Sequence, residues 1–141
     1  MPSSPLFVYG LLRRGMSAGL EAFLGAGSAE FVSEATLSGK LYDLGEYPGV
    51  RLAADAPRDA EEPPGPDVVT GELWRLRNEF HWPALDDFEG IGPDYAEPTL
   101  YKRVLAEALT EAGEAVTCWV YVYNRELGAA PRIASGDWAA R

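Results

Sequence analysis

The sequence is poor in the two residues that most often bind metals or act as nucleophiles. It has one cysteine, Cys118, and one histidine, His81, among its 141 residues. A disulfide within the chain and a zinc site of the usual cysteine and histidine types therefore cannot form, so no metal site is predicted. A Ser-His-Asp triad would have to use His81, which no nucleophile-elbow motif accompanies. Because apolar and uncharged residues flank Cys118, we expect a buried structural thiol.

Positive charge is also scarce. The chain carries 12 lysine and arginine residues against 22 aspartate and glutamate residues, a net charge of −10. No basic stripe is available to neutralise phosphates, which argues against binding to nucleic acids and to anionic membranes. The apolar run LFVYGLL is ended by Arg13 and Arg14 and is too short for a membrane span. It lacks the basic start of a signal peptide, so we expect a cytoplasmic protein.

The length of the chain suits one compact domain, so we expect a single domain over residues 1–141. Residues 55–67, DAPRDAEEPPGPD, are the one low-complexity stretch and hold four prolines. Too little chain lies on either side for two cores, so this stretch is predicted to be a mobile exposed loop rather than a linker. Nothing in the sequence indicates an oligomeric state.

Strands outnumber helices in the pattern of apolar residues. Two β-type runs joined by EAGE predict a hairpin, and a Pro-Gly turn is expected before the strand within 47–54. Ile133 and Trp138 are expected to pack the irregular tail against the core. The pattern predicts an α+β fold, a small and largely closed sheet with two short helices packed against it. The expected strands cover about 6–9, 31–44, 47–54, 68–76, 101–110 and 115–124, and the helices about 20–24 and 83–89.

The stretch VYGLLRRG, residues 8–15, combines the end of a strand, a glycine and the start of a helix. Such a turn presents backbone N–H groups that can hold a carboxylate or a phosphate. The alternative is a plain turn in which Gly10 adopts a positive φ. The stretch lacks the GKS/T of a P-loop and the GxGxxG of a dinucleotide site, so neither is predicted.

The stretch LDDFEG, residues 85–90, places three carboxylates within five residues. Gly90 is a natural left-handed end for a helix, which puts Glu89 in the last turn, near the negative end of the helix dipole. Glu89 lies four residues after Leu85 and therefore on the same face of the helix. The spacing predicts that its carboxylate points toward the core or toward a cavity that opens into the core.

The neighbours of Glu89 allow two interpretations. Phe88 is expected on the buried face of the helix, whereas Asp86 and Asp87 are expected to project into solvent. A carboxylate in partly apolar surroundings has a raised pKa, which would make Glu89 a proton shuttle near neutral pH. The alternative is a purely structural ion pair between Glu89 and a nearby cation such as Arg103.

Six short motifs follow one another along nearly the whole chain. They are VYGLLRRG (8–15), YPGV (47–50), VTGELWRL (69–76), LDDFEG (85–90), YKR (101–103) and WVYVYN (119–124). In this order they resemble the γ-glutamylcyclotransferase-like family, in its AIG2-like and γ-glutamylamine cyclotransferase branch. The resemblance implies a small mixed β-barrel with helices and a pocket lined by the first turn.

The resemblance also implies which residues form the site. Arg103 matches a supporting residue of the family. Family members commonly have threonine or serine where this chain has Leu11, and the longer stretch after the helix would allow Tyr95 to take the role of Tyr101. The implied residues are Glu89 as the catalytic residue and Tyr9, Gly10, Leu11, Leu12 and Tyr101 as substrate-binding residues.

The activity that the resemblance implies is cyclisation of a γ-glutamyl group to 5-oxoproline with release of an amine. Glu89 would act as general acid and base on a small-molecule γ-glutamyl substrate, and no metal or cofactor would be required. The released amine is left open: an amino acid, the ε-amine of lysine, a polyamine or cysteinylglycine. The alternatives are a non-catalytic module that kept the ligand pocket, which Leu11 favours, and a structural partner protein.

Overall fold

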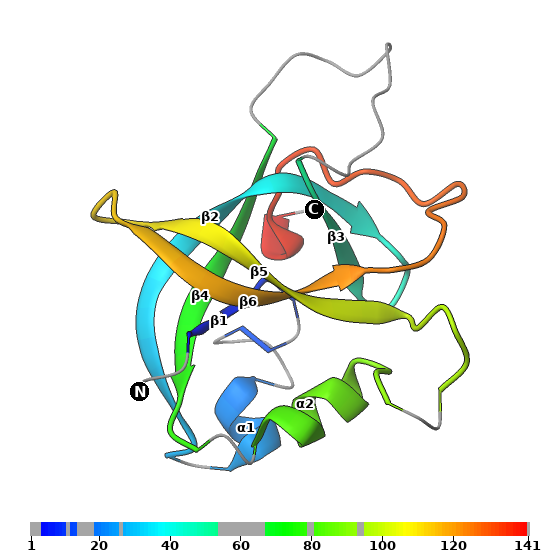
Figure 1. Ribbon diagram of the computed structural model, residues 1–141. Helices are drawn as coiled ribbons and strands as arrows, with labels where there is room; N and C mark the ends of the chain where they lie inside the picture. Colours follow the sequence, from blue (N-terminus) through cyan, green and yellow to red (C-terminus); the bar gives the residue numbers. More distant parts are fainter. Residues whose placement is uncertain are drawn as a thin grey trace.

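The structure is a computed structural model that describes residues 4–10, 12–13, 19–25, 27–53, 67–78, 81–92 and 95–140. Within these residues, strands and two α-helices follow one another and a short 3₁₀ helix lies near the end of the chain (Figure 1). The elements are β1 (Leu6–Val8), α1 (Leu20–Leu24), β2 (Ala29–Asp43), β3 (Pro48–Leu52), β4 (Val68–Leu76), α2 (His81–Phe88), β5 (Tyr101–Thr110), β6 (Ala115–Tyr123) and η1 (Trp138–Ala140).

The strands form one mixed sheet that closes on itself. Its order is β3-β2-β4-β1-β6-β5, and β5 also pairs with β2 through residues 108–110 and 35–37. β1 runs parallel to β6, with Leu6 opposite Trp119, whereas the other pairings are antiparallel. The predicted α+β fold, a small mixed β-barrel with two short helices, is therefore confirmed.

The strand β1 lies in the middle of the sheet and is buried on both faces. Successive side chains of a strand point to opposite faces, so β1 contributes to two clusters. Phe7 packs in a core cluster with Ile133 and Trp138 of the tail, which confirms the predicted packing of these two residues. Leu6 and Val8 pack in a second cluster that includes residues of α1 and α2. The strand therefore connects the interior of the barrel with the layer of helices.

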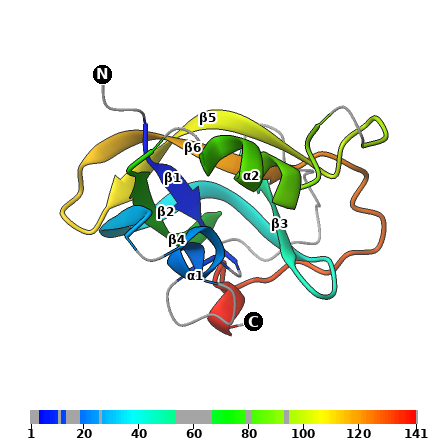
Figure 2. The same cartoon turned by 90° about the horizontal axis from the view of Figure 1, so that it is seen from below.

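The two α-helices lie side by side at one end of the barrel. They lie below the strands in Figure 1 and in front of them in Figure 2, while η1 lies beside the strands, near the C-terminus, in Figure 2. The first helix, α1, ends at Gly25, which has φ 111°. As predicted, α2 is followed by Gly90, which has φ 78°. Both values lie in the left-handed region that favours glycine and stops a helix.

The start of β3 differs from the prediction. Pro48 and Gly49 lie inside this strand, where they pair with Asp43 and Tyr42 of β2, so the expected Pro-Gly turn before the strand is wrong. The chain turns earlier, at residues that include Gly45 with φ 109°. β3 is hydrogen-bonded to β2 alone among the described strands, and a proline is tolerated at the start of such an edge strand.

Two predictions fall on residues that the structure describes only in part. The loop expected at 55–67 lies outside the described residues except for Asp67, which pairs with Arg132 at 2.6 Å. The assignment of residues 1–141 to a single domain stays a prediction. In the part of the chain that is described, no helix has the length and apolar character needed to cross a membrane.

Candidate functional site

A cavity of about 250 Å³ opens between the end of β1, the start of β3, the end of α2 and the start of β5. These four segments are distant from one another in the sequence, and the fold brings them together. Most of the lining side chains are apolar or aromatic. The lining consists of residues 7–10, 47–48, 88–89 and 100–101, together with Leu12 and Tyr121.

The end of α2 holds Glu89 at the wall of this cavity. The N–H of Gly90 donates to the carbonyl of Asp87 at 3.0 Å, and the N–H of Ile91 donates to the carbonyl of Asp86 at 2.8 Å. This pair of bonds around a left-handed glycine is a Schellman motif, which fixes the direction in which the chain leaves the helix. Leu85 is buried on the same face, so Glu89 points inward as the spacing predicts.

The carboxylate of Glu89 has an unusual electrostatic environment. Burial, and to a lesser degree the negative charge of Asp86, raise the pKa of Glu89 from 4.5 to about 7. No lysine or arginine among the described residues forms an ion pair with Glu89. Arg103, the cation named as a possible structural partner, pairs with Asp86 instead, so it is not the partner of Glu89.

Asp86 is the centre of a polar cluster beside the cavity. Its carboxylate accepts hydrogen bonds from Nε of Arg103 at 3.0 Å, from Nη2 of Arg103 at 3.3 Å and from the hydroxyl of Tyr121 at 2.7 Å. The guanidinium of Arg103 lies 4.5 Å from the ring centres of both Trp82 and Trp119. Asp86 is therefore half-buried and paired, and the prediction that it projects into solvent is wrong.

The first turn requires a glycine for a reason that the sequence did not reveal. A Cβ on Gly10 would lie 2.8 Å from Cγ of Pro48, closer than side-chain contacts allow. Gly10 is not among the described glycines with positive φ, so the predicted alternative of a left-handed turn is wrong. The turn continues through Leu12, whose carbonyl accepts from the N–H of Leu20 at 2.9 Å. Leu11 lies outside the described residues.

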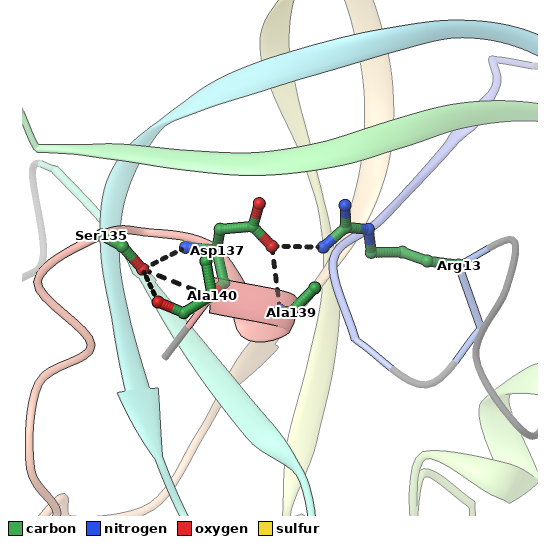
Figure 3. Close-up of polar contacts among 5 residues, drawn as sticks. All are labelled: Arg13, Ser135, Asp137, Ala139 and Ala140. Atoms are coloured by element: carbon green, nitrogen blue, oxygen red, sulfur yellow. Dashed lines mark hydrogen bonds and ion pairs between the residues drawn. The ribbon is translucent and has the colours of Figure 1, made fainter.

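An ion pair ties the first turn to the C-terminal segment. Figure 3 shows Arg13 donating through Nη1 to Oδ1 of Asp137 at 2.7 Å, with the Arg13 side chain only 11% exposed. The same oxygen accepts from the N–H of Ala139 at 2.9 Å, and the Ser135 hydroxyl donates to the carbonyl of Ala140 at 3.0 Å. Although burial acts to raise it, the bonds from Arg13 and Ala139 lower the pKa of Asp137. The tail therefore supports the turn from outside the cavity.

Two of the predicted tyrosines lie in the wall of the cavity. Tyr9 donates its hydroxyl proton to the carbonyl of Tyr121 at 2.5 Å, and Tyr101 donates to the carbonyl of Pro48 at 2.6 Å. Burial raises the pKa of Tyr9 and Tyr101 above the usual value, so both are neutral. Tyr95 is exposed, donates to Asp87 and is not part of the lining. Tyr101 rather than Tyr95 therefore lines the cavity.

Other lining residues were not predicted. Phe88 was expected on the buried face but is 45% exposed and lines the cavity, so that prediction is wrong. Tyr47, Pro48 and Tyr121 also line the cavity, and all three lie in the motifs YPGV and WVYVYN. The signal for them was their position in these motifs, because no spacing rule relates them to Glu89.

Comparisons with known proteins agree over nearly the whole chain. A family model described as γ-glutamyl cyclotransferase, AIG2-like, matches residues 6–140. The γ-glutamylcyclotransferase family protein YtfP of Escherichia coli K12 is 30% identical over 143 residues, which covers 96% of both chains. The crystal structure of a mouse AIG2-like protein gives a TM-score of 0.65 at 25% identity, covering 93% of this chain and 86% of that one. The solution structure of E. coli YtfP gives 0.61 at 27% identity, covering 95% of both chains.

Proposed function

Because this chain belongs to the AIG2-like γ-glutamyl cyclotransferase family, we propose that it cyclises a γ-glutamyl group to 5-oxoproline and releases an amine. The observation that carries the proposal is the carboxylate of Glu89. It lines the cavity, forms no ion pair with a described lysine or arginine, and has a pKa raised to about 7. A carboxylate with this pKa can both accept and donate a proton near neutral pH.

The reaction joins two atoms of one molecule. The α-amine of the γ-glutamyl group attacks the γ-carbonyl carbon, a ring C–N bond forms, and the bond from that carbon to the leaving nitrogen breaks. The α-ammonium loses two protons as it becomes the lactam nitrogen, and the leaving nitrogen gains two as it departs as an ammonium. Glu89 carries these protons in turn and ends ionised, as it began. Holding the two reacting atoms together supplies much of the remaining acceleration.

The other predicted residues are proposed to shape the pocket for the glutamyl group. Tyr9, Leu12 and Tyr101 form walls, and backbone N–H groups of the turn after β1 are proposed to bind the α-carboxylate or the developing oxyanion. Leu11 takes part through its backbone in this proposal, since its side chain has no hydroxyl. The close contact between Gly10 and Pro48 supports this arrangement because it keeps the turn against β3.

The proposal is tested with purified protein and a panel of γ-glutamyl amides. We expect 5-oxoproline and the free amine in equal amounts, measured by mass spectrometry, together with a higher melting temperature in the presence of 5-oxoproline. Stabilisation by 5-oxoproline without any product would indicate the non-catalytic binding module instead. Neither product nor stabilisation would contradict both functions.

The activity is expected to depend on the ionisation of Glu89. Because Glu89 must be ionised to accept the first proton, kcat/KM should rise with pH through about 7, where its pKa lies. Tyr9, which follows β1, and Tyr101, at the start of β5, lie near Glu89, are neutral in this range and do not compete. The measurement is a pH profile of product release between pH 5 and 9.

The same profile of Asp86→Asn provides the control. Removing the negative charge of Asp86 leaves Arg103 uncompensated beside the cavity, and both changes lower the pKa of Glu89. The rise in kcat/KM should therefore move to lower pH in this variant. A rise centred near pH 4.5 in the unchanged protein, or an unmoved rise in the variant, would contradict the assignment of Glu89.

A further inference from the structure

The cavity offers a ligand much aromatic surface and little compensation for negative charge. Among the described residues that line it, Glu89 is the one acid and no lysine or arginine is present. The two described arginines that follow lining residues by one or two positions in the sequence, Arg13 and Arg103, are already occupied. Arg13 pairs with Asp137 at 2.7 Å and Arg103 pairs with Asp86 at 3.0 Å. A second negative charge near Glu89 would therefore meet a like charge with no described cation to offset it.

Three of the four tyrosine hydroxyl groups in the cavity wall, all except that of Tyr47, are already committed to protein groups. The hydroxyl proton of Tyr9 is donated to the carbonyl of Tyr121, and that of Tyr101 to the carbonyl of Pro48. The hydroxyl proton of Tyr121 is donated to Asp86. All three bonds are between protein groups and are 2.5–2.7 Å long. These tyrosines therefore present ring surface rather than free donors to a ligand.

Two exposed phenylalanines lie next to the catalytic position. Phe88, which directly precedes Glu89 and lines the cavity, is 45% exposed, and Phe23 of α1 is 39% exposed. Their ring centres are 4.7 Å apart, so they form one continuous apolar surface across α1 and α2. The two helices lie together in front of the barrel in Figure 2. Covering these rings with an apolar group removes their surface from water and is favourable.

We propose that the amine released by this protein carries an uncharged apolar substituent, such as an arylalkyl chain, that packs on Phe23 and Phe88. The proposal rests on the proposed function, in which the leaving nitrogen takes a proton from Glu89. Groups on the first carbon attached to that nitrogen must then lie close to this carboxylate. In the proposed function the α-carboxylate of the glutamyl group is bound by N–H groups of the first turn. A second carboxylate on the leaving amine, as in a released amino acid, is disfavoured because no described cation of the lining offsets it beside Glu89.

Matched substrates separate the contributions of ring and charge. γ-Glutamylphenethylamide and γ-glutamylethylamide differ by the phenyl ring, whereas γ-glutamylphenethylamide and γ-glutamylphenylalanine differ by one carboxylate. γ-Glutamylputrescine tests a cationic substituent. We expect kcat/KM for the phenethylamide to exceed that for each of the others by about 10-fold or more. An equal or higher value for any of the three would overturn the proposal.

Two variants test the surface itself. Phe88→Ala and Phe23→Ala are expected to lower the ratio of kcat/KM for phenethylamide over ethylamide by about 10-fold. Leu109→Ala is the matched control, because Leu109 is 50% exposed at the opposite end of β5 from Tyr101, and it should leave the ratio unchanged.

An unchanged ratio in both phenylalanine variants would overturn the proposal. The two failures can be told apart. Product from every amide without preference contradicts only the choice of amine, whereas no 5-oxoproline from any amide contradicts the proposed function and this inference with it.

Discussion

Replacing Glu89 with glutamine is expected to lower kcat by about 10²–10⁴-fold, the range that general acid–base catalysis supplies. Glutamine keeps the shape of the side chain and cannot carry a proton between the two nitrogens of the substrate. The cavity is otherwise preserved, so KM should change much less than kcat. The measurement is the initial rate of 5-oxoproline formation at pH 8, where Glu89 is mostly ionised.

The matched control is Asp87→Asn, which makes the same chemical change two residues earlier on α2. Asp87 is exposed and is not part of the cavity lining, so kcat should stay within about twofold, as for surface substitutions generally. Retention of full activity by Glu89→Gln would rule out this residue as the acid and base. An equal loss in both variants would show that the effect is structural.

The position of Glu89 could be predicted because it depends on local geometry. A spacing of four residues from Leu85 puts both side chains on one face, and a glycine at position 90 ends the helix. Both features are local, since they lie within residues 85–90. The strand β4 was predicted over 68–76 for the same reason, since its pattern is complete within the segment and the structure has Val68–Leu76.

The surroundings of Glu89 could not be predicted because they depend on contacts between distant residues. The hydrogen bonds of Asp86 join it to residues 17 and 35 positions later in the chain, Arg103 and Tyr121. Helical spacing alone indicated that Asp86 was solvated, and the ion pair that forms once β5 and β6 pack beside α2 reversed this. Phe88 was expected in the core, but the end of α2 borders a cavity, which leaves the Phe88 ring partly exposed.

The raised pKa of Glu89 also affects the stability of the fold. The carboxyl group has a pKa of about 7 in the folded state and 4.5 in the unfolded state, so it is harder to ionise when the protein is folded. Its ionisation therefore destabilises the folded state. Between these two values the unfolded chain is ionised while the folded chain still holds the proton. Unfolding therefore releases a proton, and the free energy of unfolding falls as pH rises through this window. Above pH 7 both states are ionised and this contribution no longer changes.

Glu89→Gln is therefore expected to be more stable than the unchanged protein at pH 8, although it is much less active. Each unit of pKa difference corresponds to about 1.4 kcal/mol, so the stability advantage of the variant should grow by about 2–3 kcal/mol between pH 5 and pH 8. Urea unfolding at both pH values measures this, and pH 5 is preferred to lower values because the isoelectric point is about 4.5. Asp87→Asn should show no such growth. A stability difference that stays constant with pH would show that the carboxylate of Glu89 ionises normally, and that burial does not prepare it for proton transfer.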